Sequence, residues 1–145
     1  MPSKVARMLP LLLLAACAAE QGPEADLGVA DTPPATITLR IGDERDFSGV
    51  LLTFLAAAND SRCPSDVQCV WAGDASVELG AGPAVGLGPH QQLVLHTNSE
   101  PRSVEAMGLR VTLLELRPTP SQGSPIPQQE YEVDLRVVGL NWRGS

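Results

Sequence analysis

Hydrophobic and polar residues alternate with a period of two in several short segments of the chain, and this pattern is typical of β-strands. Residues 36–41 and 131–137 are the clearest examples, because in each the apolar side chains would share one face and the polar side chains the other. Residues 109–116 also alternate, but the pattern slips by one residue near Leu113–Leu114, which predicts a β-bulge there. Shorter or weaker alternations predict further strands at residues 75–79, 84–88 and 91–96.

The run of residues 47–55 is apolar on both of its faces. One face would carry Val50, Leu52 and Phe54, and the other Leu51, Thr53 and Leu55. This pattern predicts a central strand covered on both sides. A helix through residues 51–58 is the competing interpretation, because Leu and Ala favour helices. The glycine at position 49 and the turn-forming residues before it favour the strand.

Glycine and proline separate these segments. Gly80, Gly82 and Pro83 are expected to end the strand at residues 75–79, and the four prolines of residues 118–127 exclude a central strand or a helix interior there. Residues 97–107 are polar and read as irregular. The sequence therefore predicts a single all-β domain at residues 36–143, a small sandwich or barrel of about seven short antiparallel strands.

The amino terminus has the order of a secretory signal peptide. Lys4 and Arg7 precede an apolar run that continues to Ala16, which is too short to cross a bilayer as a helix, since that takes about 20 residues. The end of this run, Leu14-Ala15-Ala16-Cys17, resembles the lipobox of bacterial lipoproteins. The resemblance implies that residues 1–16 are cleaved off and that Cys17 carries a lipid anchor. A plain secretory signal, cut near Ala16 or Ala19, is the alternative.

A lipidated Cys17 would make the membrane the first partner of this protein and the cell envelope its location. Ala18 follows the cysteine in place of an aspartate, which favours the outer membrane over the inner membrane. Residues 17–35 are small, acidic and rich in proline, as is typical of a flexible linker between anchor and domain. The formal charge of −7, which becomes more negative once Lys4 and Arg7 are removed, argues against nucleic acid as a partner.

The remaining two cysteines, Cys63 and Cys69, are six residues apart, and export to an oxidising compartment favours a disulfide between them. With Cys17 lipidated, this pair accounts for all three thiols. A redox motif would normally place two residues between its cysteines. A zinc site would have to recruit His90 or His96 from distant strands. We therefore expect one structural disulfide and no metal or other cofactor.

Turn-forming and charged residues surround this pair. Asp60, Asp66 and Asp74 do not have the spacing of a calcium-binding loop, and we expect their side chains to bond nearby backbone amides. Arg62 is expected to pair with one of these aspartates, and Trp71 to pack over the core beside the disulfide. If the segment binds a ligand, the candidate residues are Arg62, Asp66, Trp71 and Asp74.

The motif of this segment resembles the signature of a family of small exported bacterial proteins, many of them lipoproteins. It reads Asp60-Ser61-Arg62-Cys63-Pro64, then Asp66-Val67, Cys69 and Trp71-Ala72-Gly73. The similarity extends over about residues 37–138. The resemblance implies a β-rich domain with this disulfide, and it implies neither an activity nor catalytic residues.

No nucleophile elbow, zinc-protease motif or phosphate-binding loop occurs in the chain. We therefore expect a non-catalytic envelope lipoprotein, a binding or structural module that contacts another envelope protein. The alternative is a protease inhibitor or another small-ligand binder that uses the disulfide-braced loop. An enzyme or metal protein built from the aspartates and a histidine is the weakest hypothesis.

Overall fold

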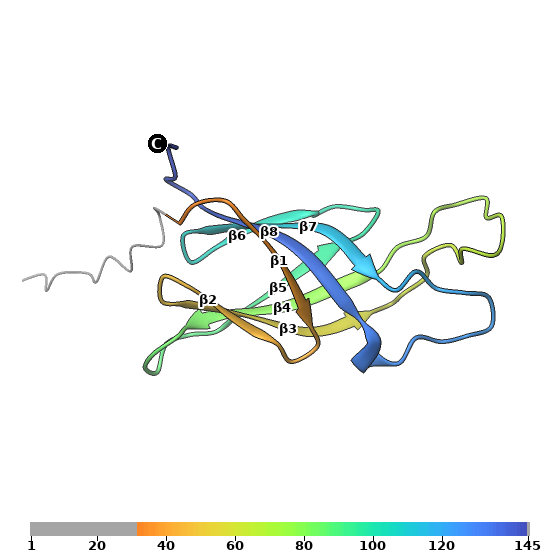
Figure 1. Cartoon of the computed structure of the whole chain (residues 1–145), viewed down its shortest axis with the longest axis horizontal. Helices are drawn as coiled ribbons and strands as arrows, with labels where there is room; N and C mark the ends of the chain where they lie inside the picture. Colours follow the sequence, from red (N-terminus) through yellow and green to blue (C-terminus); the bar gives the residue numbers. More distant parts are fainter. Residues whose placement is uncertain (1–31, 145) are drawn as a thin grey trace, which may run out of the picture.

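A computed structural model describes residues 32–144 and shows a β-sandwich of two four-stranded antiparallel sheets (Figure 1). The predicted signal peptide, Cys17 and the linker up to residue 31 lie outside the described residues. The strands are β1 (Ala35–Arg40), β2 (Glu44–Phe47), β3 (Val50–Ala58), β4 (Ser76–Pro83), β5 (Gln91–His96), β6 (Ser103–Ala106), β7 (Leu109–Arg117) and β8 (Glu132–Gly139). A short 3-10 helix, η2 (Gln128–Glu130), precedes β8. Among the described residues, no helix is long and apolar enough to cross a membrane.

The strand order is β1-β8-β7-β6 in one sheet and β2-β3-β4-β5 in the other. All neighbouring strands are consecutive in the chain except β1 and β8, and the chain passes between the sheets after β1 and after β5. Alternate residues of each strand point into the space between the sheets, as β-strand geometry requires. Val50, Leu52 and Phe54 of β3 face Val133 and Leu135 of β8 across this core, and all five are fully buried. The all-β prediction is therefore confirmed.

The predicted β-bulge in residues 109–116 is confirmed, because the pairing of β7 with β8 shifts between Leu113 and Glu115. The predicted strand at residues 47–55 is two strands, joined by a tight turn in which Ser48 and Gly49 have φ of 51° and 94°. Positive φ at both central residues matches the twist of a two-residue hairpin. The strand interpretation of residues 50–58 thus holds against the helix, but its outer face is not covered, since Leu55 is 46% exposed.

Three other expectations are wrong. Gly80, Gly82 and Pro83 do not end a strand, because Gly80 pairs with both β3 and β5 and the other two pair with β3, and this pairing overrides the low strand propensity of glycine. Residues 84–88, predicted as a weak strand, lie in the loop that follows β4. The polar segment at residues 97–107 contains the short edge strand β6, which pairs with β7.

The two ends of the sandwich carry different connections (Figure 1). We call one the loop end, because residues 59–75 between β3 and β4 and residues 118–127 after β7 both project from it. We call the other the terminal end. Here backbone hydrogen bonds join Thr32 to Gly139, Gly49 to Ala84 and Gly108 to Leu140.

Candidate functional site

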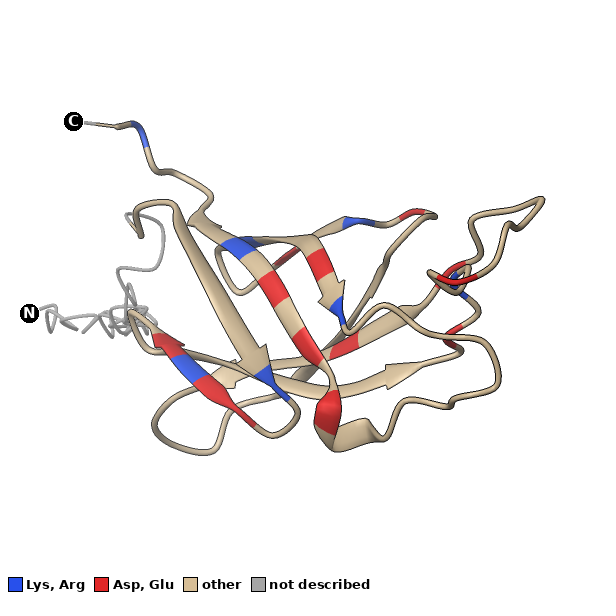
Figure 2. Cartoon of the chain, turned by 45° about the vertical axis from the view of Figure 1, so that its right-hand side comes forward, with Lys and Arg blue, Asp and Glu red and all other residues tan. Residues whose placement is uncertain are grey.

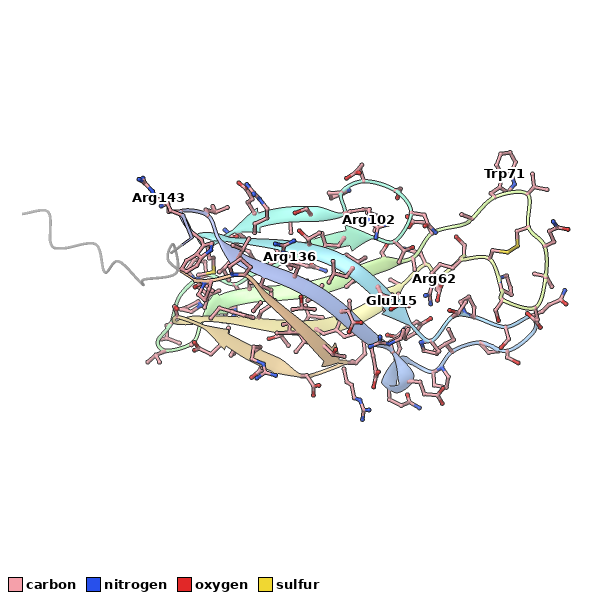
Figure 3. All side chains as sticks on the ribbon, turned by 45° about the horizontal axis from the view of Figure 1, so that its top comes forward. Arg62, Trp71, Arg102, Glu115, Arg136 and Arg143 are labelled. Carbon is pink, nitrogen blue, oxygen red and sulfur yellow. A yellow bond between two sulfur atoms is a disulfide. The ribbon has the colours of Figure 1, made fainter. Side chains whose placement is uncertain are left out.

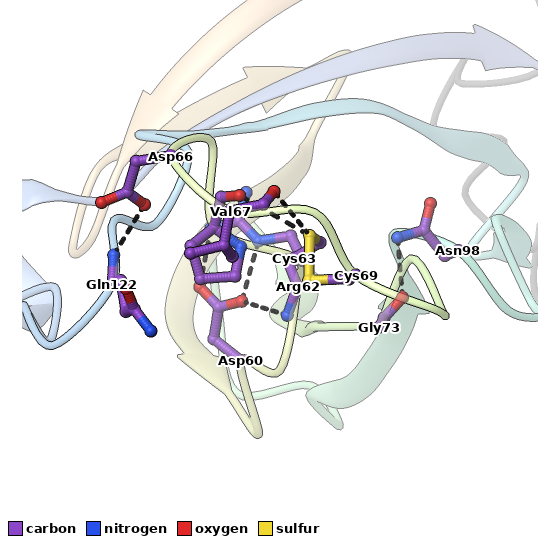
Figure 4. The surroundings of a disulfide bond; sticks show 10 residues. Asp60, Arg62, Cys63, Asp66, Val67, Cys69, Gly73, Asn98 and Gln122 are labelled. Carbon is purple, nitrogen blue, oxygen red and sulfur yellow. Dashed lines mark hydrogen bonds and ion pairs between the residues drawn. A yellow bond between two sulfur atoms is a disulfide. The ribbon is translucent and has the colours of Figure 1, made fainter.

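The candidate site is the cysteine loop, residues 59–75, whose two arms form a short ladder at its base. Ser61 donates its backbone N–H to Asp74 at 2.7 Å, and Cys63 donates to Ala72 at 2.8 Å. Beyond this ladder, the predicted disulfide between Cys63 and Cys69 is present, with the two Cα atoms 5.9 Å apart (Figure 4). The loop is therefore closed covalently near its tip and by hydrogen bonds at its base.

Gly73 allows the two arms to approach this closely. Its φ is +65°, and a Cβ atom built on it would lie 1.8 Å from the carbonyl oxygen of Ser61. No side chain fits at such a distance, so only glycine can stand at this position without displacing the opposite arm.

Arg62 and Asp60 form a buried ion pair beneath the loop, which confirms that Arg62 pairs with an aspartate. Arg62 donates to the two carboxylate oxygens at 2.8 and 2.6 Å, and the side chains are 11% and 12% exposed. The same guanidinium donates to the carbonyl oxygens of Leu116 at 2.6 Å and Pro118 at 2.9 Å, and the Tyr131 hydroxyl donates to Asp60 at 2.8 Å. Arg62 thus joins the cysteine loop to the end of β7.

The protonation states of this cluster follow from its contacts. Burial disfavours the charged form of Asp60, but hydrogen bonds from Arg62 and Tyr131 outweigh burial and hold the pKa of this carboxyl below its usual value. Burial and the bond to Asp60 raise the pKa of Tyr131 to about 12. At neutral pH the carboxyl is therefore ionised and the phenol is its donor.

Asp74 connects the cysteine loop to the β5–β6 loop. Its carboxylate accepts hydrogen bonds from Ser99 Oγ at 2.5 Å, the Asn98 backbone N–H at 2.8 Å and Thr97 Oγ1 at 2.9 Å, and it contacts His96 Nδ1 at 2.8 Å. Burial opposes ionisation, but these four contacts hold the pKa of Asp74 far below its usual range. Asp74 is therefore a bracing residue.

The two histidines differ in their surroundings. His90 is exposed. His96 is half-buried, and its Nδ1 lies 2.8 Å from the carboxylate of Asp74. Among residues 32–144, no group of three or more His, Cys, Asp and Glu side chains is arranged to hold a metal ion.

The other side of the cysteine loop contacts the proline-rich loop, residues 118–127 (Figure 4). The exposed Asp66 accepts a hydrogen bond from the backbone N–H of Gln122 at 2.9 Å. Ser65 donates its backbone N–H to the carbonyl oxygen of Pro120, also at 2.9 Å. Asp66 therefore fixes one loop against the other.

Trp71 lies at the tip, and the expectation that it packs over the core is wrong. Its side chain is 82% exposed and that of Val70 is 88% exposed. Figure 3 shows Trp71 projecting away from the sandwich, at the far end of the cysteine loop. The loop extends beyond the ends of the strands, so no apolar layer lies beneath the ring. The tip instead owes its conformation to the disulfide and to the hydrogen bonds of Asp60, Asp66 and Asp74.

Grooves flank this loop on both sides. One of about 330 Å³ lies between the cysteine loop, the β5–β6 loop and β7, and it contains Arg62, Arg102 and Leu114. Arg102 crosses its floor and donates to the carbonyl oxygens of Thr97 and Leu113. A second groove, of about 470 Å³, separates the cysteine loop from the proline-rich loop. Arg102, Leu114 and Tyr131 were not identified from the sequence, because they reach this site from segments far from the cysteine loop in the chain.

Comparisons with protein-family models, with curated proteins and with solved structures find no match to this chain.

Proposed function

We propose that this protein is a lipid-anchored cell-envelope protein whose β-sandwich is a non-catalytic binding module. The tip of the cysteine loop is the surface that contacts the partner, another protein of the envelope. The anchor is Cys17, as the lipobox-like sequence before it implies.

The observation that carries this proposal is the exposure of Trp71 and Val70 on a braced loop. Large aromatic side chains dominate the binding energy of protein interfaces, and they do so from rigid positions near the centre of the contact. A loop that is already held in one conformation loses less entropy when it binds. The disulfide and the hydrogen bonds at the base of the loop supply that rigidity.

The charged residues of the site support a binding role over a catalytic one. The guanidinium of Arg62 and the carboxylates of Asp60 and Asp74 bond to groups within the protein. A general acid or base must instead reach a proton of the substrate. These three side chains hold the loops in place.

A photo-crosslinking residue at position 71, introduced in living bacteria, tests the proposal. We expect one discrete adduct with an envelope protein, and none from the same residue at position 45, which is exposed on β2. The Trp71→Ala variant should then bind the purified partner roughly 30-fold more weakly, as for a side chain that contributes about 2 kcal/mol. Equal binding by this variant, or a saturable hydrolytic activity of the purified protein, would contradict the proposal.

Inhibition of a secreted protease is a second use of the same tip. Val70 and Trp71 directly follow Cys69, and the loop backbone is fixed to the proline-rich loop through Ser65. Such a segment could occupy the substrate groove of a protease with an apolar specificity pocket. A panel of secreted proteases assayed with micromolar protein tests this alternative, and failure to slow any of them would exclude it.

Binding of a small anionic ligand is a third candidate, favoured by the groove of about 330 Å³. Arg102 in this groove donates to carbonyl oxygens and not to a carboxylate. Thermal-shift measurements with small carboxylates and phosphate test it. A shift that persists in Arg102→Gln would contradict binding at this groove.

A further inference from the structure

The terminal end, opposite the cysteine loop, contains the β2–β3 turn, the β4–β5 loop and the first described residues of the chain (Figure 1). Thr32, the first described residue, accepts a backbone hydrogen bond from Gly139 and donates its hydroxyl to Ser48 at 3.3 Å. The next residue of that turn, Gly49, accepts from Ala84 at the start of the β4–β5 loop. The chain that leads back to Cys17 therefore joins the domain beside the β2–β3 turn, which in turn bonds to the β4–β5 loop.

This end carries exposed apolar side chains. Val85 is 90% exposed, Leu87 is fully exposed, and Leu140 is 39% exposed. Trp142, which is half-buried, follows Leu140 in the same segment. Scattered single apolar residues are ordinary on a protein surface, but several at one end of a small domain indicate a contact surface.

The β4–β5 loop carries no charge. No Asp, Glu, Lys or Arg stands between Glu78 and Glu100, so this loop is tan in Figure 2, whereas β4 itself contains Glu78. Among the described residues, the charged side chains near this end include Arg45, Asp46, which accepts from the Gly49 backbone, the paired Glu105 and Arg110, and the exposed Arg143. The β4–β5 loop itself can approach anionic lipid without charge repulsion, and the acidic residues of the linker precede Thr32 in the sequence.

The length of the linker between Cys17 and Thr32 limits how far the terminal end can lie from the membrane. A chain from Cys17 to Thr32 spans at most roughly 50 Å even when fully extended. If Cys17 is lipidated, Thr32 therefore stays within roughly 50 Å of the bilayer, and the terminal end is the end nearest to the anchor along the chain.

We propose that the terminal end docks on the phospholipid surface that holds the anchor, with Val85 and Leu87 inserted among the headgroups. This inference rests on the proposed function, because it needs the lipid on Cys17. Trp142 and Arg143 contribute side chains suited to the boundary between headgroups and acyl chains. Docking in this way directs the cysteine loop and Trp71 away from the membrane, since the two ends are opposite (Figures 1 and 3).

The only two tryptophans of the chain lie at the two ends and report on them separately. The full protein, purified from bacterial membranes, is reconstituted into vesicles of phosphatidylethanolamine and phosphatidylglycerol with or without brominated phosphatidylcholine. In Trp71→Phe, brominated lipid should quench most of the Trp142 fluorescence. In Trp142→Phe, the Trp71 fluorescence should be unchanged.

The double variant V85S/L87S, made in the Trp71→Phe background, should lose most of the Trp142 quenching. The matched control Val70→Ser replaces an equally exposed valine at the loop end and should leave the quenching of Trp142 unchanged. Both sets of side chains lie outside the core, so folding is not affected. Lipidated protein with Trp142 unquenched, or with both tryptophans quenched alike, overturns the docking alone. A mass spectrum without a lipid on Cys17 overturns the anchor as well as the docking.

Discussion

The loop end of the sandwich is held by charged side chains and a disulfide in addition to backbone hydrogen bonds, whereas the terminal end is held mainly by backbone hydrogen bonds. At the loop end, Asp60, Arg62 and Asp74 tie three loops together and Cys63–Cys69 closes the longest of them. At the terminal end, Gly49 bonds to Ala84 of the β4–β5 loop, and Gly108 and Gly139 bond to the terminal segments at Leu140 and Thr32. The ladder of the cysteine loop covers only its base, so polar side chains and the disulfide are needed to fix the rest of the loop. Rigidity is therefore added where the chain leaves the sheets.

Among the changes that test this difference between the two ends, Arg62→Ala should lower the stability of the protein the most. The change leaves the carboxylate of Asp60 buried without its cation, and we expect the free energy of unfolding to fall by about 3 kcal/mol. Chemical denaturation measures it. Arg45→Ala, at an exposed position of β2, is the control and should change stability by less than about 0.5 kcal/mol. Equal stability of the two variants would show that the buried ion pair does not hold the loop end.

Glycine-to-alanine changes at the two ends distinguish the energetic cost of backbone strain from that of a steric clash with a neighbouring segment. Gly73 and Gly86 both have positive φ, but only Gly73 lies against another segment, whereas nothing lies within 4 Å of a Cβ at Gly86. We expect Gly86→Ala to cost about 1 kcal/mol and Gly73→Ala about 3 kcal/mol, because the second change adds a steric clash to the strain. Thermal unfolding of both variants gives the difference. Similar losses would contradict the close approach at Ser61.

Removing the disulfide should have an intermediate effect. The variant C63S/C69S should lose about 2 kcal/mol of stability, because the unfolded chain is no longer constrained by the ring. Reductant should destabilise the wild type by a similar amount and leave this variant unchanged. Destabilisation of the variant by reductant would mean that the loss has another cause.

The smallest effects are those of pH. The pKa of Asp74 is lowered on folding, so its contribution to stability is present above its ordinary value of 3.8 and is lost as the pH falls through the folded value. The pKa of Tyr131 is raised, so its contribution is present below pH 10 and is lost as the pH rises towards 12. Unfolding midpoints measured across pH should therefore fall at both extremes. Asp74→Asn should flatten the acid side and Tyr131→Phe the alkaline side, and an unchanged profile in either variant would refute its assignment.

Much of the sandwich could be predicted because alternation records which side chains face the core. Residues 131–137 and the bulge near Leu113 followed directly from this pattern. The edge strand β6 could not, because its alternation extends over only four residues within a polar segment. Gly80 and Pro83 likewise signal a break unless the strands on both sides of β4 are known.

The candidate site was predicted less completely. The close spacing of Cys63 and Cys69 and the nearby aspartates sufficed to infer the disulfide and the pairing of Arg62. The exposed position of Trp71 could not be predicted from the sequence, because burial of an aromatic ring depends on whether its loop lies over the core or projects beyond it. The roles of Arg102 and Tyr131 depend on contacts between distant segments, which alternation does not record.

A recognition surface at the tip of the cysteine loop requires Trp71 to be exposed yet held in place. Its fluorescence in the Trp142→Phe variant tests this directly, because Trp71 is then the only tryptophan. We predict emission like that of tryptophan in water, efficient quenching by iodide, and an anisotropy that decays faster once Cys63 and Cys69 are replaced by serine. Blue-shifted emission protected from iodide would place the ring against the core and contradict a recognition surface at the tip of the cysteine loop.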